Sequence, residues 1–397
     1  MNPKNILVGS DDYNCSQYES LGFYISFDGG SGWKQVCMSS RFFDGQEYTP
    51  AAGPILGYDR NGVAYIGGPY GSSRSGGQYW GPEAFEKSSD GVTWSAPAPA
   101  MVRQNYFPDY CWMAVDTNVT SPYVNSVYIS CVMIGPNNQN TRNQVVVSHS
   151  NDGGDTWQLV NVAPPQINPD VDSYTDLTIG NDGTVYVTWM YCNSGFYFCD
   201  DDYGYMVFSK SSDGGNTWTA PTRMVTVKLN HGNVPNSKAG VWDTPAIGVD
   251  NSNGPHAGNL YVVMYNWTGK FMQVQVVRST DGGGAWSKPV PVAAGITHDQ
   301  FLPWISVSPT GLVGVSWLDR RNDPANIDYQ AFSAISVDGG LSFQPNVQLT
   351  TAFSDPDKFF GDYTGNTWDG PDYFLVAWMD DSNSTYMQDV VGGIRLH

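Results

Sequence analysis

The chain has 397 residues, including 44 Gly, 25 Pro, 14 Trp, 24 Tyr and 17 Phe, and it carries 38 acidic against 19 basic residues for a net charge of -19. So many turn formers and aromatics argue against an α or α/β protein and predict many short strands joined by tight turns. The acidity argues against nucleic acid or an anionic membrane as the main partner. No apolar run reaches the roughly 18–20 residues that a spanning helix needs.

The first predicted element, residues 5–36, contains three strands and the sequence Ser26-Phe-Asp-Gly-Gly-Ser-Gly-Trp33. This pattern of a serine, an aspartate, glycines and an aromatic recurs five more times, and the copy that ends at Trp94 is one residue shorter. Successive copies begin 62, 62, 61, 68 and 57 residues apart. Self-similarity at such a long period predicts a solenoid or a propeller.

Five complete units follow in chain order, and each reads as four antiparallel strands with the repeated motif as the hairpin turn between the third and fourth strands. Glycine supplies positive φ in such a turn, and Asp and Ser side chains bond nearby backbone N–H groups. The units begin near Pro50, Asp109, Asp176, Asp243 and Asp299. Residues 361–397 add three strands without a motif. The sequence therefore predicts an all-β, seven-bladed β-propeller of four-stranded antiparallel blades, with residues 1–397 as a single domain and six blades as the alternative.

The six motif copies resemble the Asp-boxes of the sialidase-like Asp-box (BNR-repeat) β-propellers, and the resemblance covers nearly the whole chain. It implies that the boxes are fold elements remote from the active site. It also implies that the loops at the opposite ends of the strands surround the mouth of a central channel, where the site is expected.

The six cysteines form three pairs that are close in sequence, Cys15/Cys37, Cys111/Cys131 and Cys192/Cys199. Pairing of nearest neighbours is the simplest of the alternatives. Disulfides favour an oxidising compartment, so we expect a secreted, extracellular protein whose sequence is that of the mature form.

Six of the ten arginines fall in loops predicted to lie at the channel mouth. Because arginine recognises carboxylates with a fixed two-pronged geometry, we expect an acidic oligo- or polysaccharide as the partner. The expected binding residues are Arg41, Arg74, Arg103, Arg142, Arg321, His231, Trp80 and Tyr110. The alternative interpretation is that the exposed aromatics only cap the blades.

For catalysis, the favoured cluster is His298 and Asp299 together with Arg320, because a neutral histidine can take a proton while arginine offsets charge on a carboxylate. Tyr363 beside Asp362 matches the tyrosine nucleophile arrangement of sialidases. No cofactor is required. Acids at the starts of the inner strands could bind Ca²⁺ in the central channel or only cap the strands: Asp109, Asp176, Asp243, Asp299 and Asp362.

The similar propellers include glycoside hydrolases, polysaccharide lyases that act at uronic acids, and lectins. The Phe/Tyr-Arg-Ile-Pro motif of sialidases is absent, so a classical exo-sialidase is not expected. With only four Glu in the chain, a lyase is slightly preferred over a two-carboxylate hydrolase. The mouth loops differ between blades, which favours one unique site and hence an enzyme, here one that cleaves an acidic, uronate- or sialate-like glycan. We also expect a monomer. A non-catalytic, lectin-like propeller is the alternative.

Overall fold

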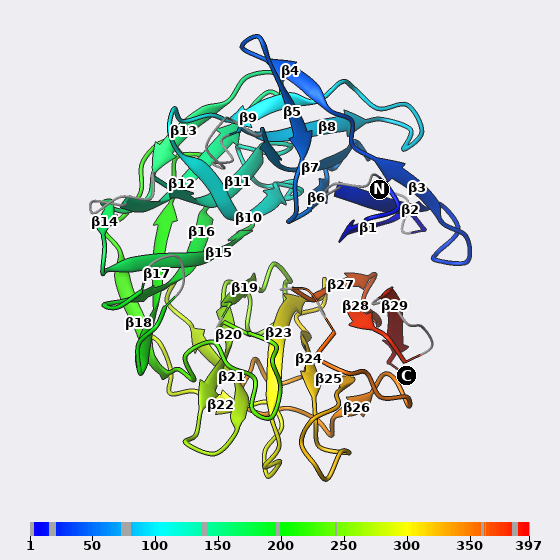
Figure 1. Ribbon diagram of the computed structural model, residues 1–397, viewed down its shortest axis with the longest axis vertical. Coiled ribbons are helices and arrows are strands. Elements are labelled where there is room, and N and C mark those ends of the chain that lie inside the picture. The colour runs from blue at the N-terminus through cyan, green and yellow to red at the C-terminus, as the bar shows by residue number, and fades with distance from the viewer. Residues whose placement is uncertain are drawn as a thin grey trace. The chain divides into compact units, whose positions relative to one another are not determined.

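The computed structural model describes residues 4–15, 21–72, 81–135, 142–195, 199–242, 244–358, 361, 363–382 and 388–396, with the backbone alone for 142. Every regular element in this part of the chain is a β-strand (Figure 1). No helix in it is long and apolar enough to cross a membrane. The strands form seven consecutive antiparallel sheets, the blades of a seven-bladed β-propeller, as predicted.

The first three sheets lie in one compact unit, made of residues 1–168, 172–187 and 209–221. Sheet 1 contains β1 (Ile6–Asp11), β2 (Leu21–Ser26) and β3 (Lys34–Cys37). Sheet 2 contains β4 (Arg41–Phe43), β5 (Gln46–Pro50), β6 (Ile55–Tyr58), β7 (Ala64–Gly71), β8 (Glu83–Ser88) and β9 (Ala98–Met101). Sheet 3 contains β10 (Phe107–Val115), β11 (Val127–Ile134), β12 (Arg142–Ser150), β13 (Gln158–Asn161) and β14 (Gln166–Ile167).

Sheet 4 contains β15 (Val171–Ile179), β16 (Val185–Cys192), β17 (Tyr203–Ser211) and β18 (Thr222–Lys228), and its residues are divided between the two units. The second unit holds the other three sheets. Sheet 5 contains β19 (Ala246–Val249), β20 (Leu260–Trp267), β21 (Met272–Ser279) and β22 (Val290–Pro291). Sheet 6 contains β23 (Gln300–Val307), β24 (Val313–Asp319), β25 (Gln330–Ser336) and β26 (Val347–Gln348). Sheet 7 contains β27 (Gly365–Asp369), β28 (Tyr373–Asp380) and β29 (Gln388–Arg395).

The serine and aspartate of the repeated motif form a hydrogen-bonded turn in all six copies, although in the shortened second copy the serine accepts the N–H three residues further on and not four. In the third copy, the Ser150 hydroxyl donates to Oδ1 of Asp152 at 2.7 Å and accepts the Gly154 N–H at 2.7 Å. Hydrogen bonds from the side chain and backbone of Thr156 hold the pKa of Asp152 well below its usual value. The motif therefore closes the hairpin with its own polar groups, and its aspartates are occupied in doing so.

Sheet 2 carries a hairpin in a segment that the sequence predicts to be a loop. β4 and β5 are joined by Asp44 and Gly45, whose φ angles are 50° and 78°. A two-residue hairpin turn needs two positive φ angles for its twist to match that of the flanking strands. β5 pairs with the end of β7, so Arg41 lies on a strand at the edge of the sheet. Arg142, likewise expected in a loop, begins β12.

The three predicted disulfides are all present: Cys15–Cys37, Cys111–Cys131 and Cys192–Cys199. Separate hydrophobic clusters fill the spaces between neighbouring sheets. One of them contains Leu21, Phe23, Ile66, Tyr70 and Ala84, and a second contains Phe85, Met113, Cys111 and Cys131. Ala84 and Phe85 are adjacent in β8, so the two faces of this strand belong to different clusters.

Candidate functional site

The predicted catalytic pair Asp299 and Arg320 is buried in the second unit, and neither side chain has any exposed surface. Nη1 of Arg320 lies 3.4 Å from Oδ2 of Asp299, which also accepts a hydrogen bond from the Asn326 amide at 2.6 Å. Oδ1 of Asp299 accepts the backbone N–H of Met272 at 2.8 Å. Burial raises the pKa of Asp299 and lowers that of Arg320. These contacts tie β21 and the residue before β23 to the loop after β24, and they enclose both side chains in the described part of the unit.

The neighbours of this pair are partly engaged as well. Arg321 donates to Oδ2 of Asp319 at 2.6 Å and to Asn346 at 2.9 Å, and its guanidinium lies 4.2 Å from the ring centre of Phe332. His298 is half-buried and has no hydrogen bond to another described residue. Tyr363 is half-buried just before β27. The structure thus leaves His298 and Tyr363 as untested candidates, without the arginine partner expected for the histidine.

Two predicted binding residues that the structure describes, Arg103 and His231, have contacts of their own. Arg103 donates to Gln144 at 2.8 Å and to Asn161 at 2.5 Å, and burial lowers its pKa. The two ring nitrogens of His231 lie 3.2 Å from Asp200 and 3.0 Å from Asp202. Arg74 and Trp80, like the side chain of Arg142, fall outside the described residues.

Tyr110 lies at a bulge in β10 and adopts a φ of 52°. Its ring is buried against Tyr174, with 4.2 Å between ring centres, and its carbonyl accepts the Thr175 hydroxyl at 2.8 Å. In the second unit, Leu302 has a φ of 46° at the bulge in β23, and its carbonyl accepts the Thr364 hydroxyl at 2.8 Å. This repeated contact joins successive inner strands, so Tyr110 has a structural use independent of any ligand.

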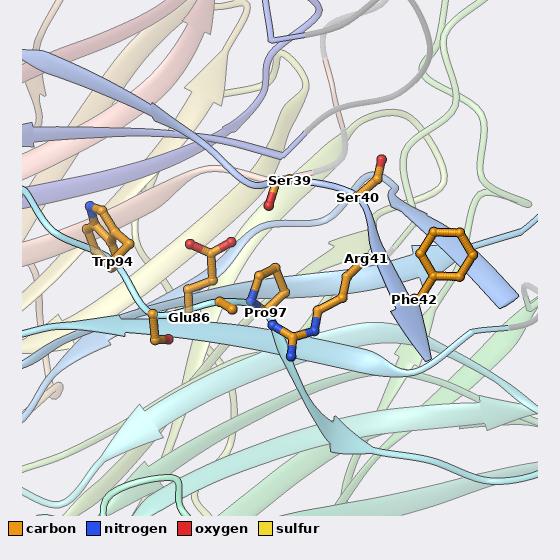
Figure 2. Close-up of a pocket in the computed structure, with 9 residues that line it drawn as sticks. Ser39, Ser40, Arg41, Phe42, Glu86, Trp94 and Pro97 are labelled. Atoms are coloured by element: carbon orange, nitrogen blue, oxygen red, sulfur yellow. The ribbon is translucent and has the colours of Figure 1, made fainter. Parts of the chain in front are cut away.

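A pocket of about 790 Å³ in sheet 2 brings Arg41 together with a residue that sequence reasoning did not single out, Glu86 (Figure 2). The walls come from the start of β4, from β8, and from the end of the shortened second motif with the segment after it. This pocket therefore lies beside a motif, whereas the resemblance implied a site remote from the motifs. The lining residues are Ser39, Ser40, Arg41, Phe42, Glu86, Trp94, Ser95, Ala96 and Pro97. The volume is in the range of pockets that hold small ligands.

Glu86 is the one carboxyl group among the residues that line this pocket. Burial raises its pKa to about 7, although the backbone N–H of Ser39 and the nearby charge of Arg41 act in the opposite direction. Ser39 is itself held in place, because its carbonyl accepts the Tyr70 hydroxyl at 2.9 Å. A carboxyl group with a pKa near 7 can take up or release a proton at neutral pH.

Arg41 and Phe42 are exposed. Two polar side chains of the pocket, Arg41 and Trp94, make no hydrogen bond to another described residue. The Arg41 guanidinium has no hydrogen bond or ion pair to another residue of the described part of the chain. The indole nitrogen of Trp94 is buried and likewise has no partner there. The pocket therefore presents an exposed guanidinium beside a carboxyl group whose pKa is raised to about 7.

A second unusual carboxyl group, Glu83, lies on the opposite face of β8. It is fully buried, neither oxygen has a hydrogen-bond partner among the described residues, and burial raises its pKa well above the usual value, with the nearby charge of Asp109 adding to the effect. Its oxygen and the sulfurs of Cys111 and Cys131 lie within 4.8 Å of one another. Because those sulfurs form a disulfide, this group is not a metal site.

Ca²⁺ binding by the inner-strand acids stays a prediction. Asp243 and Asp362 fall outside the described residues. Asp109 is half-buried, and its carboxylate accepts the N–H of Tyr110. Asp176 is buried and accepts the N–H of Leu177 at 2.8 Å. Such bonds to the next residue agree with the capping alternative.

The repeat itself contains a signal that would have found Glu86. Glu86 lies two residues before the serine of the second motif, and the equivalent positions in the other copies are uncharged: Tyr24, Ser148, Ser209, Val277 and Ala334. An acid on a buried strand position that is uncharged in every other copy departs from what the fold requires. Comparing the copies position by position separates such a residue from the scaffold.

Comparison with known proteins agrees with the architecture. No family model matches the chain, and no curated protein matches it. Among solved structures, a protein of unknown function from Dyadobacter fermentans matches with a TM-score of 0.55 and 14% identity, over 87% of this chain and 94% of that chain. A match at this level of identity shows that the two chains share a fold.

Two further matches are enzymes that act on glycans. The GH93 α-L-arabinofuranosidase of Fusarium graminearum, in complex with arabinobiose, matches with a TM-score of 0.53 and 13% identity, over 86% of this chain and 92% of that chain. The NanB sialidase of Streptococcus pneumoniae matches with a TM-score of 0.51 and 11% identity, over 98% of this chain and 83% of that chain. This chain is thus similar in fold to propellers that cleave sugars.

Proposed function

We propose that this protein is a secreted carbohydrate-active enzyme that cleaves an acidic glycan in the Glu86 pocket, by elimination in preference to hydrolysis. The observation that carries the proposal is a buried carboxyl group, with its pKa raised to about 7, that shares a pocket with an exposed arginine bonded to no other described residue. The fold shared with an arabinofuranosidase and a sialidase supports the substrate class. The three disulfides support an oxidising, extracellular compartment.

Elimination at a uronate needs a base and a group that neutralises the carboxylate, and the pocket has one of each. Arg41 would pair with the sugar carboxylate and so acidify the proton on C5. The ionised Glu86 would take that proton, the electrons of the C5–H bond would form the C4–C5 double bond, and the C4–O bond would break. Protonated Glu86 would then give its proton to the departing oxygen, so one residue would serve as base and then as acid.

Hydrolysis is less well supported at this pocket. The usual hydrolytic mechanisms need two carboxyl groups about 5–9.5 Å apart, and Glu86 is the one acid among the lining residues. The rival non-catalytic function, a lectin-like propeller, would use the same pocket without needing a carboxyl group that titrates near neutral pH.

Purified protein incubated with a panel of uronate- and sialate-containing polysaccharides tests the proposal. We expect new reducing ends together with the ultraviolet absorbance of an unsaturated uronate. Because the free enzyme needs Glu86 ionised, kcat/KM should rise as the pH passes through about 7. Glu86→Gln should lower kcat by a factor of at least about 100.

The matched control is Glu47→Gln, which changes an exposed glutamate on β5 outside the pocket and should retain full activity. Reducing ends without the unsaturated product would replace elimination with hydrolysis. Saturable binding of an acidic glycan with no turnover on any panel member would replace the enzyme with a lectin.

A further inference from the structure

The third strand of sheet 7, β29, has no fourth strand beside it in the described part of the chain (Figure 1). In sheets 2 to 6 each third strand does pair with a fourth: β8 with β9, β12 with β13, β17 with β18, β21 with β22 and β25 with β26. β28 pairs with the whole length of β29 along its inner edge, without a register shift. The outer edge of β29 is therefore a regular row of backbone groups at a position where these five sheets carry another strand.

The hydrogen bonds between β28 and β29 determine which backbone groups point towards the outer edge. In the same register, the N–H of Leu396 donates to the carbonyl of Asp372 at 2.8 Å. Because bonded and non-bonded pairs alternate along an antiparallel ladder, the even-numbered residues of β29 bond to β28. The N–H and C=O groups of the odd-numbered residues, such as Val391 and Gly393, point away from β28.

The outer edge of β29 lacks the features that usually prevent pairing with another chain. Native edge strands are protected by proline, lysine or a β-bulge, among other devices. β29 has the sequence Gln-Asp-Val-Val-Gly-Gly-Ile-Arg, which contains no proline or lysine, and its pairing with β28 shows no bulge. Its two charged residues, Asp389 and Arg395, lie near opposite ends of the strand. The edge is thus suited to the addition of a strand.

We propose that β29 pairs with β29 of a second copy of this chain, antiparallel and about a two-fold axis at Gly392. Asp389 of each copy then lies opposite Arg395 of the other, so the axis creates two ion pairs. Odd-numbered residues lie opposite odd-numbered residues, and their outward N–H and C=O groups bond across the axis. Gly392 faces its own copy in a non-bonded pair, where the strands approach most closely, and it has no side chain to obstruct them. This dimer replaces the monomer expected from the sequence.

Charge complementarity selects this register over its neighbours. An axis at Val391 would place Asp389 opposite Gly393, and an axis at Gly393 would place Arg395 opposite Val391. Arg395 already lies at the edge, with Nη1 3.5 Å from Asp372 and 57% of its side chain exposed, so a second carboxylate can reach it. Exposed ion pairs contribute little free energy. They therefore fix the register, and the affinity comes from other groups.

The affinity comes from the backbone hydrogen bonds and from apolar side chains on the other face of β29. Val390 and Ile394 pack against the hydrophobic cluster that contains Phe374 and Trp378. In the proposed register Val390 of one copy lies opposite Ile394 of the other, so this apolar face continues across the axis. One pair of strands is a small interface, and we expect a dissociation constant on the order of 10–100 µM.

Sedimentation velocity of the intact protein, from about 1 µM to about 300 µM, tests the dimer. Asp389→Arg and Arg395→Asp each bring like charges together and should weaken association about tenfold or more. The double variant reverses both charges and should restore the affinity of the wild type. Glu47→Arg makes the same change of net charge as Asp389→Arg at an exposed position of β5, and it should not weaken association.

Amide hydrogen exchange at the two ends of this concentration range gives a second measurement, which does not depend on the folding of a variant. Mass spectrometry with electron-transfer fragmentation resolves single residues. The N–H groups of Val391 and Gly393 should exchange slowly only at high concentration, whereas those of Val390 and Gly392, bonded to β28, should exchange slowly at both.

Three results would overturn the inference. One is a monomer throughout the concentration range. Another is a double charge variant that associates as weakly as its single parents. The third is slow exchange of Val391 and Gly393 at low concentration, because a segment of the same chain would then cover the edge. The pairing uses sheet 7 alone, so none of these results bears on turnover in the Glu86 pocket.

Discussion

Glu83 and Glu86 are two of the four glutamates in the chain. Burial raises the pKa of both, but their surroundings differ. Glu86 faces a pocket in which a proton can be exchanged. Glu83 is fully buried, where its charged form would be unsolvated, so its pKa is raised well above the usual value. The environment of each residue, and not its chemical type, decides which of the two can act on a ligand.

The burial of Glu83 predicts a pH-dependent stability. Its folded pKa lies well above the ordinary value of 4.5, so above pH 4.5 the unfolded chain loses a proton that the folded chain keeps. The free energy of unfolding should therefore fall as the pH rises from about 4.5 towards the folded pKa, by up to about 1.4 kcal/mol per pH unit for one proton. Glu83→Gln, which stays neutral, should remove this decline.

Urea denaturation of both proteins between pH 4 and pH 8 measures the effect. Relative to the wild type, Glu83→Gln should gain stability as the pH rises, and Glu47→Gln, at an exposed position, should follow the wild type. A constant difference between wild type and Glu83→Gln across this range would show that Glu83 ionises normally in the folded protein.

At the scale of elements, the repeated motif is a self-contained turn, and its serine is the central group. The Ser336 hydroxyl donates to Asp338 at 2.8 Å and accepts the buried N–H of Gly340 at 2.8 Å. Ser336→Ala leaves that N–H and part of the aspartate unsatisfied, and should lower the free energy of unfolding by about 1–3 kcal/mol. Urea denaturation measures the loss, with the exposed Ser31→Ala as the control. Equal losses in both variants would assign the motif no special stabilising role.

Sequence patterns predict the repeating elements well and the contacts between them poorly. The motif and the alternating strands identify the seven sheets, and the spacing of the cysteines identifies the three disulfides, because these features depend on residues close in sequence. They predict the start of the fourth unit at Asp176, although β15 begins at Val171. They do not predict the hairpin of β4 and β5, because its second strand pairs with β7, beyond the next strand in the chain.

The functional residues are harder still to predict, for a physical reason. Arg320 looks like a free cation in the sequence, but its partners include Asp299 and the carbonyl of Pro235, which lies 85 residues away. Whether a charged residue faces ligand or protein depends on such distant contacts, which a single sequence does not reveal. Arg41 is among the predicted binding residues only because the arginines are considered as a class, and the same reasoning passes over its neighbour Glu86.

At the scale of the whole molecule, the net charge of -19 opposes the approach of an acidic glycan. Salt shortens the range of this repulsion from about 30 Å at 0.01 M to about 8 Å at 0.15 M, while a direct contact with Arg41 is screened less. We therefore expect kcat/KM on an anionic substrate to rise over this range of NaCl. The same series in sucrose, which carries no charge, should have no such effect. A fall in kcat/KM with added salt would mean that local pairing at Arg41 outweighs the repulsion.

The position of Glu86 depends on the pleat of β8, since Glu83 and Glu86 are three positions apart and successive side chains of a strand point to opposite faces. A slip of one residue along β8 would turn Glu86 towards the disulfide side and carry its neighbour into the pocket. The β8–β9 pairing already contains an irregularity between Glu83 and Ala84. Insertions or deletions in β8 should therefore abolish activity even where the sheet still forms. The pairing register of this one strand decides which side chain faces the pocket.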